Sequence, residues 1–465
     1  MLEVPKTWDY EADVLIVGGG TAGLPAAVAA IDAGAKKVVV LELMSYCAAS
    51  LALVNVGPAF AGTDLQKAEG IDDSAEIYYK DGTERGQGIP ELWRAFADNQ
   101  LAVYNWTKEI GVEYQALFAM PAHTRKRGIF VKGNDMLRCM ERAAKAKGAE
   151  ILFLHRATRL IVDQATGRVL GCKVLVKDNK VEKNFKANKA VILATGGFGR
   201  NKEMLDEFGP KFIDWVPTMS PGHLGDGLKM CLAVGAGTKY FGRAVSGSFA
   251  VDVDTKTAIV DFIGYAGGVL VNVNGQRFWD EANRDSFYGQ ASEEGMRQPG
   301  GIFFSVFDQK AKDLVRHGKM GRAKPVQGDT IEAVAKAAGI DPKGLKATID
   351  KYNNDIKTKG YDTVLDRRTQ EGCDGKPPTI DTAPFYAIKC KGSISSFKGG
   401  IAINSKAQVL DQYGAVIPNL YAAGELTGGF WGPHGTYLPG TMVSASMTYG
   451  MIAGKNATQE KAWTK

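Results

Sequence analysis

Residues 13–42 read DVLIVGGGTAGLPAAVAAIDAGAKKVVVLE. An apolar run enters a glycine-rich turn, an alanine-rich stretch follows, and a second apolar run ends in an acid. This order predicts two parallel strands joined by a helix, with Gly18, Gly20 and Gly23 forming a G-x-G-x-x-G turn. The first glycine permits the tight turn, the second lets the backbone approach a pyrophosphate, and the third lets the helix pack against the strand. We therefore expect a dinucleotide-binding unit.

Glu42 indicates which dinucleotides fit. It follows the glycine turn by about twenty residues and closes the second strand, where a carboxylate accepts hydrogen bonds from both ribose hydroxyls and repels a 2′-phosphate. The phosphates of the ligand would lie at the N-terminus of the helix. These features favour FAD or NAD.

Composition narrows the class of protein. The chain has 465 residues, 45% of them hydrophobic, which is too long for one compact core and predicts two domains. Its formal net charge of +6 is modest and its basic residues are scattered, so nucleic acid is not an expected partner. No run approaches the roughly 20 apolar residues that a membrane crossing needs, and the polar start of the chain favours a cytoplasmic location.

Cysteine and histidine spacing gives no sign of a metal. The six cysteines are dispersed without a C-x-x-C pair, so no ligands for an iron–sulfur cluster or a c-type haem are expected. The histidines do not group with cysteines or carboxylates in a metal-binding pattern. We expect no metal site.

The pattern of expected strands and helices changes twice along the chain. Residues 1–242 and 382–465 read as an α/β domain, and residues 243–381 read as an inserted α+β module with a hairpin turn at Asn274 and Gly275. The expected helices of the two parts cover 90–110, 134–147, 308–318, 330–338 and 343–357.

Four further motifs identify a family resemblance: VILATGGFGRN (191–201), GHLGDGLKM (222–230), GGVLVNVNGQRFWDE (267–281) and IPNLYAAGELTGG (417–429). With these motifs in this order, nearly the whole chain resembles the fumarate reductase/3-ketosteroid dehydrogenase superfamily. The resemblance implies a discontinuous Rossmann-like domain that holds FAD noncovalently and an inserted α+β capping domain that clamps substrate against the isoalloxazine. It also implies hydride transfer between flavin N5 and a carbon beside an activating carbonyl.

The resemblance assigns cofactor contacts position by position. The residues that it implies are Gly18, Gly20, Thr21, Ala22, Gly23, Glu42, Ser50, Ala157, Thr195, Gly196, Asp226, Glu425, Thr441, Met442 and Val443. The last three would open a helix whose dipole stabilises anionic reduced flavin. The chain departs from the family at SYCAAS (45–50), where a pair of glycines and a serine usually approach the flavin and only Ser50 keeps its place.

The substrate motifs depart from those of fumarate reductases. SISSFKGGI (393–401) and SGSFAVD (246–252) lack the histidines of those enzymes, and GTYLPG (435–440) lacks their substrate-binding arginine. Tyr437 instead resembles the tyrosine with which steroid-type members bind a ketone oxygen, and Gly440 would add a backbone amide. A phenol and an amide directed at a carbonyl oxygen lower the barrier, because negative charge develops there.

A second catalytic group must handle a proton on the opposite face of the bond. FWDEANRDSFYG (278–289) offers Arg284, near the proton-donating arginine of fumarate reductases, and Tyr288, which resembles the base tyrosine of ketosteroid dehydrogenases. A tyrosine base needs a pKa well below 10, which an adjacent guanidinium would provide. The sequence does not choose between them. His434, Phe397 and Trp431 are the candidates for substrate contact.

We therefore expect an FAD-dependent oxidoreductase acting on a carbon–carbon bond next to a carbonyl, with a 3-ketosteroid-like ketone as substrate and an external electron donor or acceptor. One alternative is reduction of an unsaturated carboxylate of the fumarate or aryl-acrylate type, with Arg284 and His434 binding the carboxylate. Another is a flavin-bearing electron-transfer subunit without an organic substrate.

Overall fold

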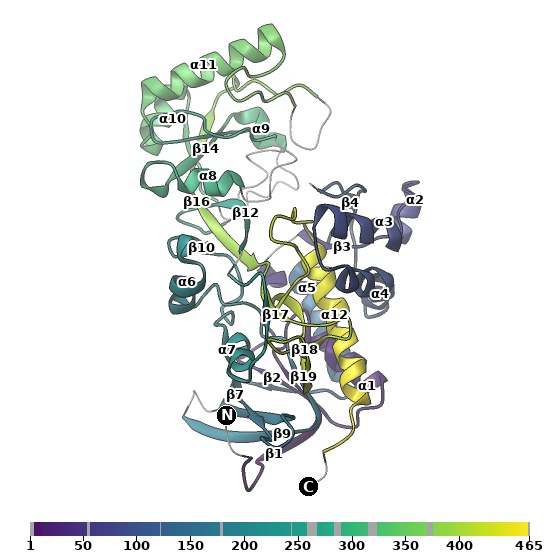
Figure 1. The fold of residues 1–465 in the computed structure, drawn as a ribbon. Coiled ribbons are helices and arrows are strands. Elements are labelled where there is room, and N and C mark those ends of the chain that lie inside the picture. The colour runs from purple at the N-terminus through teal and green to yellow at the C-terminus, as the bar shows by residue number, and fades with distance from the viewer. Residues whose placement is uncertain are drawn as a thin grey trace. The chain divides into compact units, whose positions relative to one another are not determined.

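The computed structural model describes residues 4–53, 56–120, 122–176, 180–242, 244–257, 267–282, 290–314, 323–369 and 375–463. The chain divides into two compact units (Figure 1). Unit 1 comprises Met1–Ile213, Met219–Ala244 and Ser396–Lys465, and unit 2 comprises Asp214–Thr218 and Val245–Ser395. The second change of unit falls within strand β16 (Phe385–Phe397), later than the 381/382 boundary expected from sequence, because β16 pairs with β14 (Phe303–Phe307) of unit 2.

Unit 1 is built on a mainly parallel sheet with the strand order β18-β19-β9-β1-β2-β6. These strands are β1 (Tyr10–Val17), β2 (Val38–Glu42), β6 (Glu150–Phe153), β9 (Val181–Leu193), β18 (Gln408–Leu410) and β19 (Val416–Ala422). In register, Val17 lies opposite both Leu41 and Leu193, and Leu193 lies opposite Ala422. The carboxyl ends of four parallel strands therefore meet at one edge, the position at which open α/β sheets bind ligands.

Two helices lie side by side against this sheet, α1 (Gly23–Asp32) and α12 (Thr441–Gln459) (Figure 1). They approach closely because α12 carries glycine at the contact: a Cβ at Gly450 or Gly454 would lie 2.2 Å from the carbonyl oxygen of Ala22 or Ala26. Within unit 1, this packing joins the C-terminal helix to the first β-α unit of the chain.

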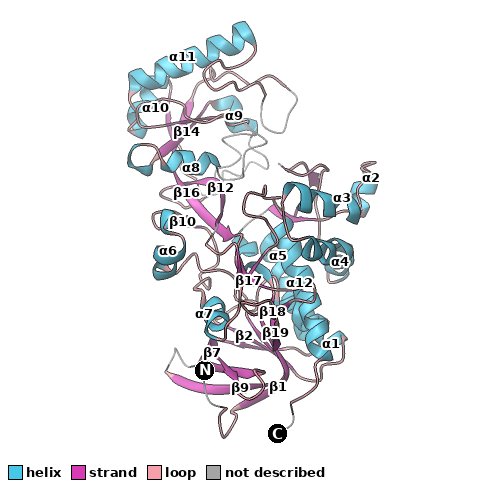
Figure 2. Ribbon diagram, viewed as in Figure 1, coloured by secondary structure: helices cyan, strands magenta, loops and turns pink. Residues whose placement is uncertain are grey.

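Smaller elements complete unit 1 (Figure 2). The helices are α2 (Asp64–Ala68), α3 (Ala75–Lys80), α4 (Pro90–Glu109), α5 (Gly133–Ala146), α6 (Lys202–Phe208) and α7 (Asp226–Ala233), with helical turns η1 (Ser50–Leu53), η2 (Asp81–Arg85), η3 (Pro210–Phe212) and η7 (Gly424–Leu426). The strands are β7 (Arg156–Val162) and β8 (Val169–Val176), which extend the main sheet from β9, and two three-stranded sheets. Those sheets are β3 (Val56–Ala59), β5 (Gly128–Phe130) and β4 (Leu117–Phe118), and β11 (Thr238–Lys239), β17 (Gly400–Ala402) and β20 (Thr427–Gly428).

Unit 2 is an α+β module whose sheet has the order β10-β16-β14-β13, with two further strands paired to β16. Its strands are β10 (Val216–Pro217), β12 (Ala244–Asp252), β13 (Val269–Val271), β14, β15 (Val326–Gly328) and β16, and its helices are α8 (Gln290–Met296), α9 (Gln309–Leu314), α10 (Ile331–Ala338) and α11 (Pro342–Lys359), with the turn η5 (Pro299–Gly301). Buried side chains of α10 and α11, including Val334, Leu345 and Ile349, form one core with those of β13 and β14.

The helices that sequence predicts are present. α4, α5, α10 and α11 match their expected ranges to within a few residues, and α9 covers the described part of 308–318. The hairpin turn at Asn274 and Gly275 is confirmed, because Gly275 has φ +73° and the Asn272 N–H donates to the Gln276 carbonyl at 3.0 Å. Among the residues that the structure describes, no helix combines the length and the apolar composition that a membrane crossing requires.

Gly23 is the position at which the fold of unit 1 is most sensitive to an added methyl group. A Cβ there would lie 1.8 Å from the Gly18 carbonyl oxygen, whereas a Cβ at Gly20 would meet nothing closer than 3.4 Å. We expect Gly23→Ala to reduce the free energy of unfolding by about 3 kcal/mol through overpacking. We expect Gly20→Ala to change it by less than about 0.5 kcal/mol. Urea unfolding of the two apoproteins measures this difference, and equal stability would contradict it.

Candidate active site

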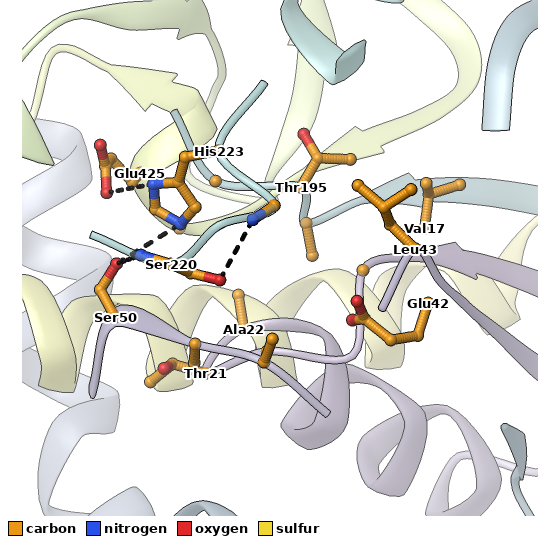
Figure 3. Close-up of a pocket in the computed structure, with 18 of the residues that line it drawn as sticks. Val17, Thr21, Ala22, Glu42, Leu43, Ser50, Thr195, Ser220, His223 and Glu425 are labelled. Atoms are coloured by element: carbon orange, nitrogen blue, oxygen red, sulfur yellow. Dashed lines mark hydrogen bonds and ion pairs between the residues drawn. The ribbon is translucent and has the colours of Figure 1, made fainter. Parts of the chain in front are cut away.

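A cavity of about 960 Å³, including solvent at its mouth, lies at the carboxyl edge of the main sheet (Figure 3). Its size is in the range of cofactor and ligand sites. It is lined by most of the residues that the family resemblance implied: Gly18, Gly20, Thr21, Ala22, Glu42, Ser50, Ala157, Thr195, Gly196, Asp226, Glu425, Met442 and Val443. Gly23 and Thr441 are not among the lining residues. Elements from distant parts of the sequence thus converge on one space within unit 1.

The glycine turn forms one wall of the cavity. Gly18 has φ +109°, in the left-handed region that favours glycine, and a Cβ on it would lie 2.4 Å from the Ala194 carbonyl oxygen. Gly20 faces the cavity and is not crowded by the protein itself. The turn therefore requires glycine for protein packing at Gly18 and Gly23, while glycine at position 20 leaves room for a ligand.

Glu42 is held in place by backbone amides. Its carboxylate is 5% exposed and accepts hydrogen bonds from the N–H groups of Gly19 and Met44, both at 2.8 Å. Burial raises the pKa of Glu42, and the amide bonds oppose that shift. Each carboxylate oxygen accepts one of these two bonds and has a second lone pair. Glu42 can therefore still accept hydrogen bonds from ribose hydroxyls.

Arg156 and Asp226 lie beside Ala157 and form a two-point ion pair across the cavity wall. The Arg156 Nε and Nη2 atoms donate to the two carboxylate oxygens at 2.8 and 2.9 Å. Asp226 is the first residue of α7, after the left-handed Gly225. Arg156 was not predicted from sequence, although its position next to Ala157 was a usable signal.

Thr195 provides a test of whether a polar ligand fits the cavity. Its hydroxyl is buried and has no hydrogen-bond partner among the described residues, although Thr195 lines the cavity. An unsatisfied buried hydroxyl is costly, so a polar group of a ligand is expected to bind it. Gly227 makes room for this side chain, because a Cβ there would lie 2.1 Å from the Thr195 Oγ1 atom.

A cluster of three polar side chains lines the cavity away from Glu42. Ser50, His223 and Glu425 lie side by side there (Figure 3). The His223 Nε2 atom lies 3.5 Å from the Ser50 Oγ atom, and the His223 Nδ1 atom lies 3.5 Å from the Glu425 Oε2 atom. The Phe397 N–H donates to the other Glu425 oxygen at 3.1 Å. His223 was missed by the sequence analysis, although it lies within the GHLGDGLKM motif (222–230) that carries the family resemblance.

The backbone is shaped around this pair of side chains. A Cβ at Gly196 would lie 2.4 Å from the His223 ring, and one at Gly197 would lie 2.3 Å from the Glu425 carboxylate. Burial raises the pKa of Glu425 to about 8 and lowers the pKa of His223 to about 4, with a further contribution from the Arg200 guanidinium. Both side chains are therefore uncharged at neutral pH.

The N-terminus of α12 also reaches the cavity. The helix begins after Gly440, whose φ is +78°, and Met442 and Val443 line the cavity. Thr441 is fully buried, and its Oγ1 atom lies 2.7 Å from the Tyr78 hydroxyl. The helix therefore starts where the sequence placed it, with the positive end of its dipole at the cavity.

The predicted substrate residues fall into different environments. The Tyr437 ring lies 5.1 Å from the Trp431 ring, and Trp431 is buried and lines a smaller cavity of about 340 Å³ together with Met442. His434 is exposed. Phe397 is fully buried and stacks on Phe198 at 4.1 Å, so the structure places it in the core. Arg284 and Tyr288 lie outside the described residues.

Within the described ranges, no three histidine, cysteine, aspartate or glutamate side chains gather in an arrangement that could hold a metal ion. The cysteines at 47, 139, 172, 231 and 390 are buried free thiols, and Cys373 lies outside the described residues. The polar groups described above, which face the main cavity, fit a dinucleotide.

The mainly parallel sheet, the glycine turn and the lined cavity define a dinucleotide-binding protein. The chain belongs to the FAD binding domain family, whose model matches residues 13–438. It is similar to the fumarate reductase (cytochrome) of Shewanella frigidimarina, with 30% identity across 96% of this chain and 77% of the relative. It is also similar to the urocanate reductase of Eggerthella lenta, with 30% identity across 98% of this chain and 76% of the relative.

Solved structures give the same result. The open conformation of a flavocytochrome c3 fumarate reductase matches with a TM-score of 0.85 and 28% identity, over 97% of this chain and 79% of that one. A 3-ketosteroid-Δ4-(5α)-dehydrogenase from Rhodococcus jostii, in complex with 4-androstene-3,17-dione, matches with a TM-score of 0.74 and 25% identity over 98% of each chain. The protein is an FAD-dependent oxidoreductase of the fumarate reductase family.

Removing the Thr195 hydroxyl tests the fit of the cofactor. We expect Thr195→Val to weaken FAD binding about three- to tenfold, the value of one hydrogen bond, without lowering the stability of the apoprotein, because no protein partner is lost. Thr448→Val is the control: the Thr448 hydroxyl bonds the Ser444 carbonyl at 2.8 Å, so stability should fall while FAD binding stays. Titration of the apoproteins with FAD measures the affinity, and thermal melting measures the stability of the apoproteins. Unchanged FAD affinity in Thr195→Val would contradict the assignment.

The Glu425 pKa predicts a pH dependence of apoprotein stability. Because folding raises this pKa from 4.5 to about 8, only the unfolded chain releases the proton over that interval, and stability falls as pH rises. Folding lowers the pKa of His223 from 6.5 to about 4. This shift makes the apoprotein less stable only as the pH falls below 6.5, because the unfolded chain then takes up the proton first. Between pH 6.5 and 8 the wild-type melting temperature should therefore fall more steeply than that of Glu425→Gln. Parallel curves for the two apoproteins would contradict the shift.

Proposed function

We propose that the protein moves hydride between FAD and a carbon–carbon bond conjugated with a ketone, with an apolar 3-ketosteroid-like ring as substrate. Tyr437 donates a hydrogen bond to the ketone oxygen, and the Gly440 N–H donates a second one. FAD, when bound, supplies the atom that gives or takes the hydride. The protein lowers the barrier by placing two donors where negative charge develops on the oxygen.

The setting of Tyr437, whose ring lies 5.1 Å from that of the buried Trp431, is the observation that carries this proposal. Burial raises the pKa of Tyr437, and the nearby Glu425 and Tyr78 raise it further. The phenol therefore keeps its proton at neutral pH. A protonated phenol is a hydrogen-bond donor suited to a carbonyl, whereas it offers no charge to a carboxylate.

The charge distribution of unit 1 supports a neutral substrate. Among the described residues that line its two cavities near Tyr437 and the glycine turn, the only cationic side chain is Arg156, which Asp226 neutralises. Recognition of a dicarboxylate would need unpaired cations, because buried charges must be paired. The rings of Phe430 and Trp431, 4.9 Å apart, offer an aromatic surface instead.

Reduction of an unsaturated carboxylate is the second candidate. The names of the curated relatives favour it, since they include fumarate, urocanate and acrylate reductases. On this alternative, Arg284 binds or protonates the substrate together with His434. For either substrate we propose an external electron donor or acceptor and a proton-handling role for Arg284 or Tyr288.

Tyr437→Phe separates the two candidates. For a ketone substrate we expect hydride transfer to slow about 100-fold, the usual effect of losing one donor to a developing oxyanion. For an aryl acrylate we expect a change of less than about threefold, because no phenol-to-ketone bond is involved. Stopped-flow measurement of flavin reoxidation gives both rates. Tyr413→Phe, at a 95% exposed position, is the control. Equal slowing for both substrates would contradict the role given to Tyr437.

A further inference from the structure

A buried ionic cluster lies in unit 1 beneath the segment that carries Tyr437. Its centre is Arg127, which is fully buried and pairs with both oxygens of Asp73 at 2.7 Å. A third guanidinium nitrogen bonds Asp81, and the guanidinium lies 4.2 Å from the Tyr78 ring centre. Neither the dinucleotide site nor the proposed catalytic groups account for this cluster.

His123 connects this cluster to the segment that carries Tyr437 and Gly440, called the catalytic segment below. Its Nε2 atom lies 2.8 Å from the Pro439 carbonyl oxygen, and its Nδ1 atom lies 3.4 Å from an Arg127 nitrogen. A carbonyl only accepts and a guanidinium only donates, so the proton must be on Nε2 and the lone pair on Nδ1. Burial and the Arg127 charge lower the pKa of His123 to about 3, which keeps the ring neutral.

Two more contacts hold the residues that follow Pro439. The Ala59 N–H donates to the Gly440 carbonyl at 3.2 Å, and the Tyr78 hydroxyl bonds the Thr441 hydroxyl at 2.7 Å. Gly440 between them has the left-handed φ of +78°. These contacts hold the backbone on both sides of the Gly440 amide, which is proposed to bind the substrate.

We propose that His123, oriented by Arg127, is a positioning residue that fixes residues 439–441 and thereby directs the Gly440 N–H and the Tyr437 hydroxyl toward the substrate carbonyl. The catalytic consequence rests on the proposed function, whereas the positioning of the segment does not. Stability alone does not explain the cluster, because apolar side chains of similar volume often stabilise a core as well as buried ion pairs do. Directional donors specify where a carbonyl lies, which apolar side chains cannot do.

Hydrogen exchange of the holoenzyme tests the positioning directly. His123→Leu removes the donor to Pro439, and His123→Gln keeps an N–H donor at a similar reach. We expect peptides covering residues 435–443 to exchange about tenfold faster in the Leu variant, with most of the protection restored in the Gln variant and with β1 peptides unchanged. Exchange that rises equally in both variants, or everywhere in the Leu variant, would overturn the proposal.

A measurement on the wild-type protein covers the case in which the Leu variant does not fold. In holoprotein labelled with ¹⁵N-histidine, with the His123 signal identified by its loss in His123→Gln, the ring should be the neutral Nε2–H form at pH 6. The Nδ1–H form or a charged imidazolium would overturn the assignment, because neither can accept from Arg127 while donating to Pro439.

A double-mutant cycle tests the catalytic consequence. With a ketone substrate, His123→Leu should lower kcat about tenfold and change KM less than twofold, because the lost alignment matters in the transition state. In a Tyr437→Phe background the same change should cost less than about threefold, because one of the two donors that His123 positions is already removed. Equal factors in both backgrounds would contradict positioning. If the wild-type enzyme reduces no ketone, the proposed function fails, while the exchange experiment still decides the role of His123.

Discussion

The fold of unit 1 depends on a contact that only glycine permits, the approach of Gly23 to the Gly18 carbonyl. An added Cβ would come within 1.8 Å of that oxygen, so any larger residue would force α1 away from β1. With the contact made, the first helix begins at the edge where the parallel strands end. The cavity, the carboxylate of Glu42 and the packing of α12 on α1 all depend on this start.

Electrostatics divide unit 1 into two kinds of polar site. Around the cavity, Glu425 and His223 are uncharged near neutral pH, and Tyr437 keeps its proton, since burial shifts each pKa toward the neutral form. Beneath the catalytic segment, Arg127 remains ionised because two carboxylates pair with it. The uncharged side chains at the cavity fit the dinucleotide assigned to it, and the fixed charges of the Arg127 cluster fit a structural role.

The sequence predicted the features that have a regular spacing. The glycine turn, Glu42 and the helices follow from periodicity and fixed offsets, and the resemblance added Thr195 and Glu425. The roles of His123, His223 and Arg127 could not be predicted, because they depend on partners that are 46 to 316 positions away in the sequence. Phe397 lies in the core because its ring stacks on that of Phe198, a contact between residues far apart in the sequence. Arg284 and Tyr288 remain predictions.

The central claim, ketone chemistry at a flavin, is tested most directly by reoxidation of the reduced protein. The purified yellow protein would be reduced anaerobically with dithionite and mixed separately with a 4-ene-3-ketosteroid, an aryl acrylate and fumarate while the flavin absorbance near 450 nm is recorded. The account predicts that the steroid restores the absorbance rapidly and that fumarate does not. Rapid reoxidation by the acrylate or fumarate, with no response to the steroid, would contradict it.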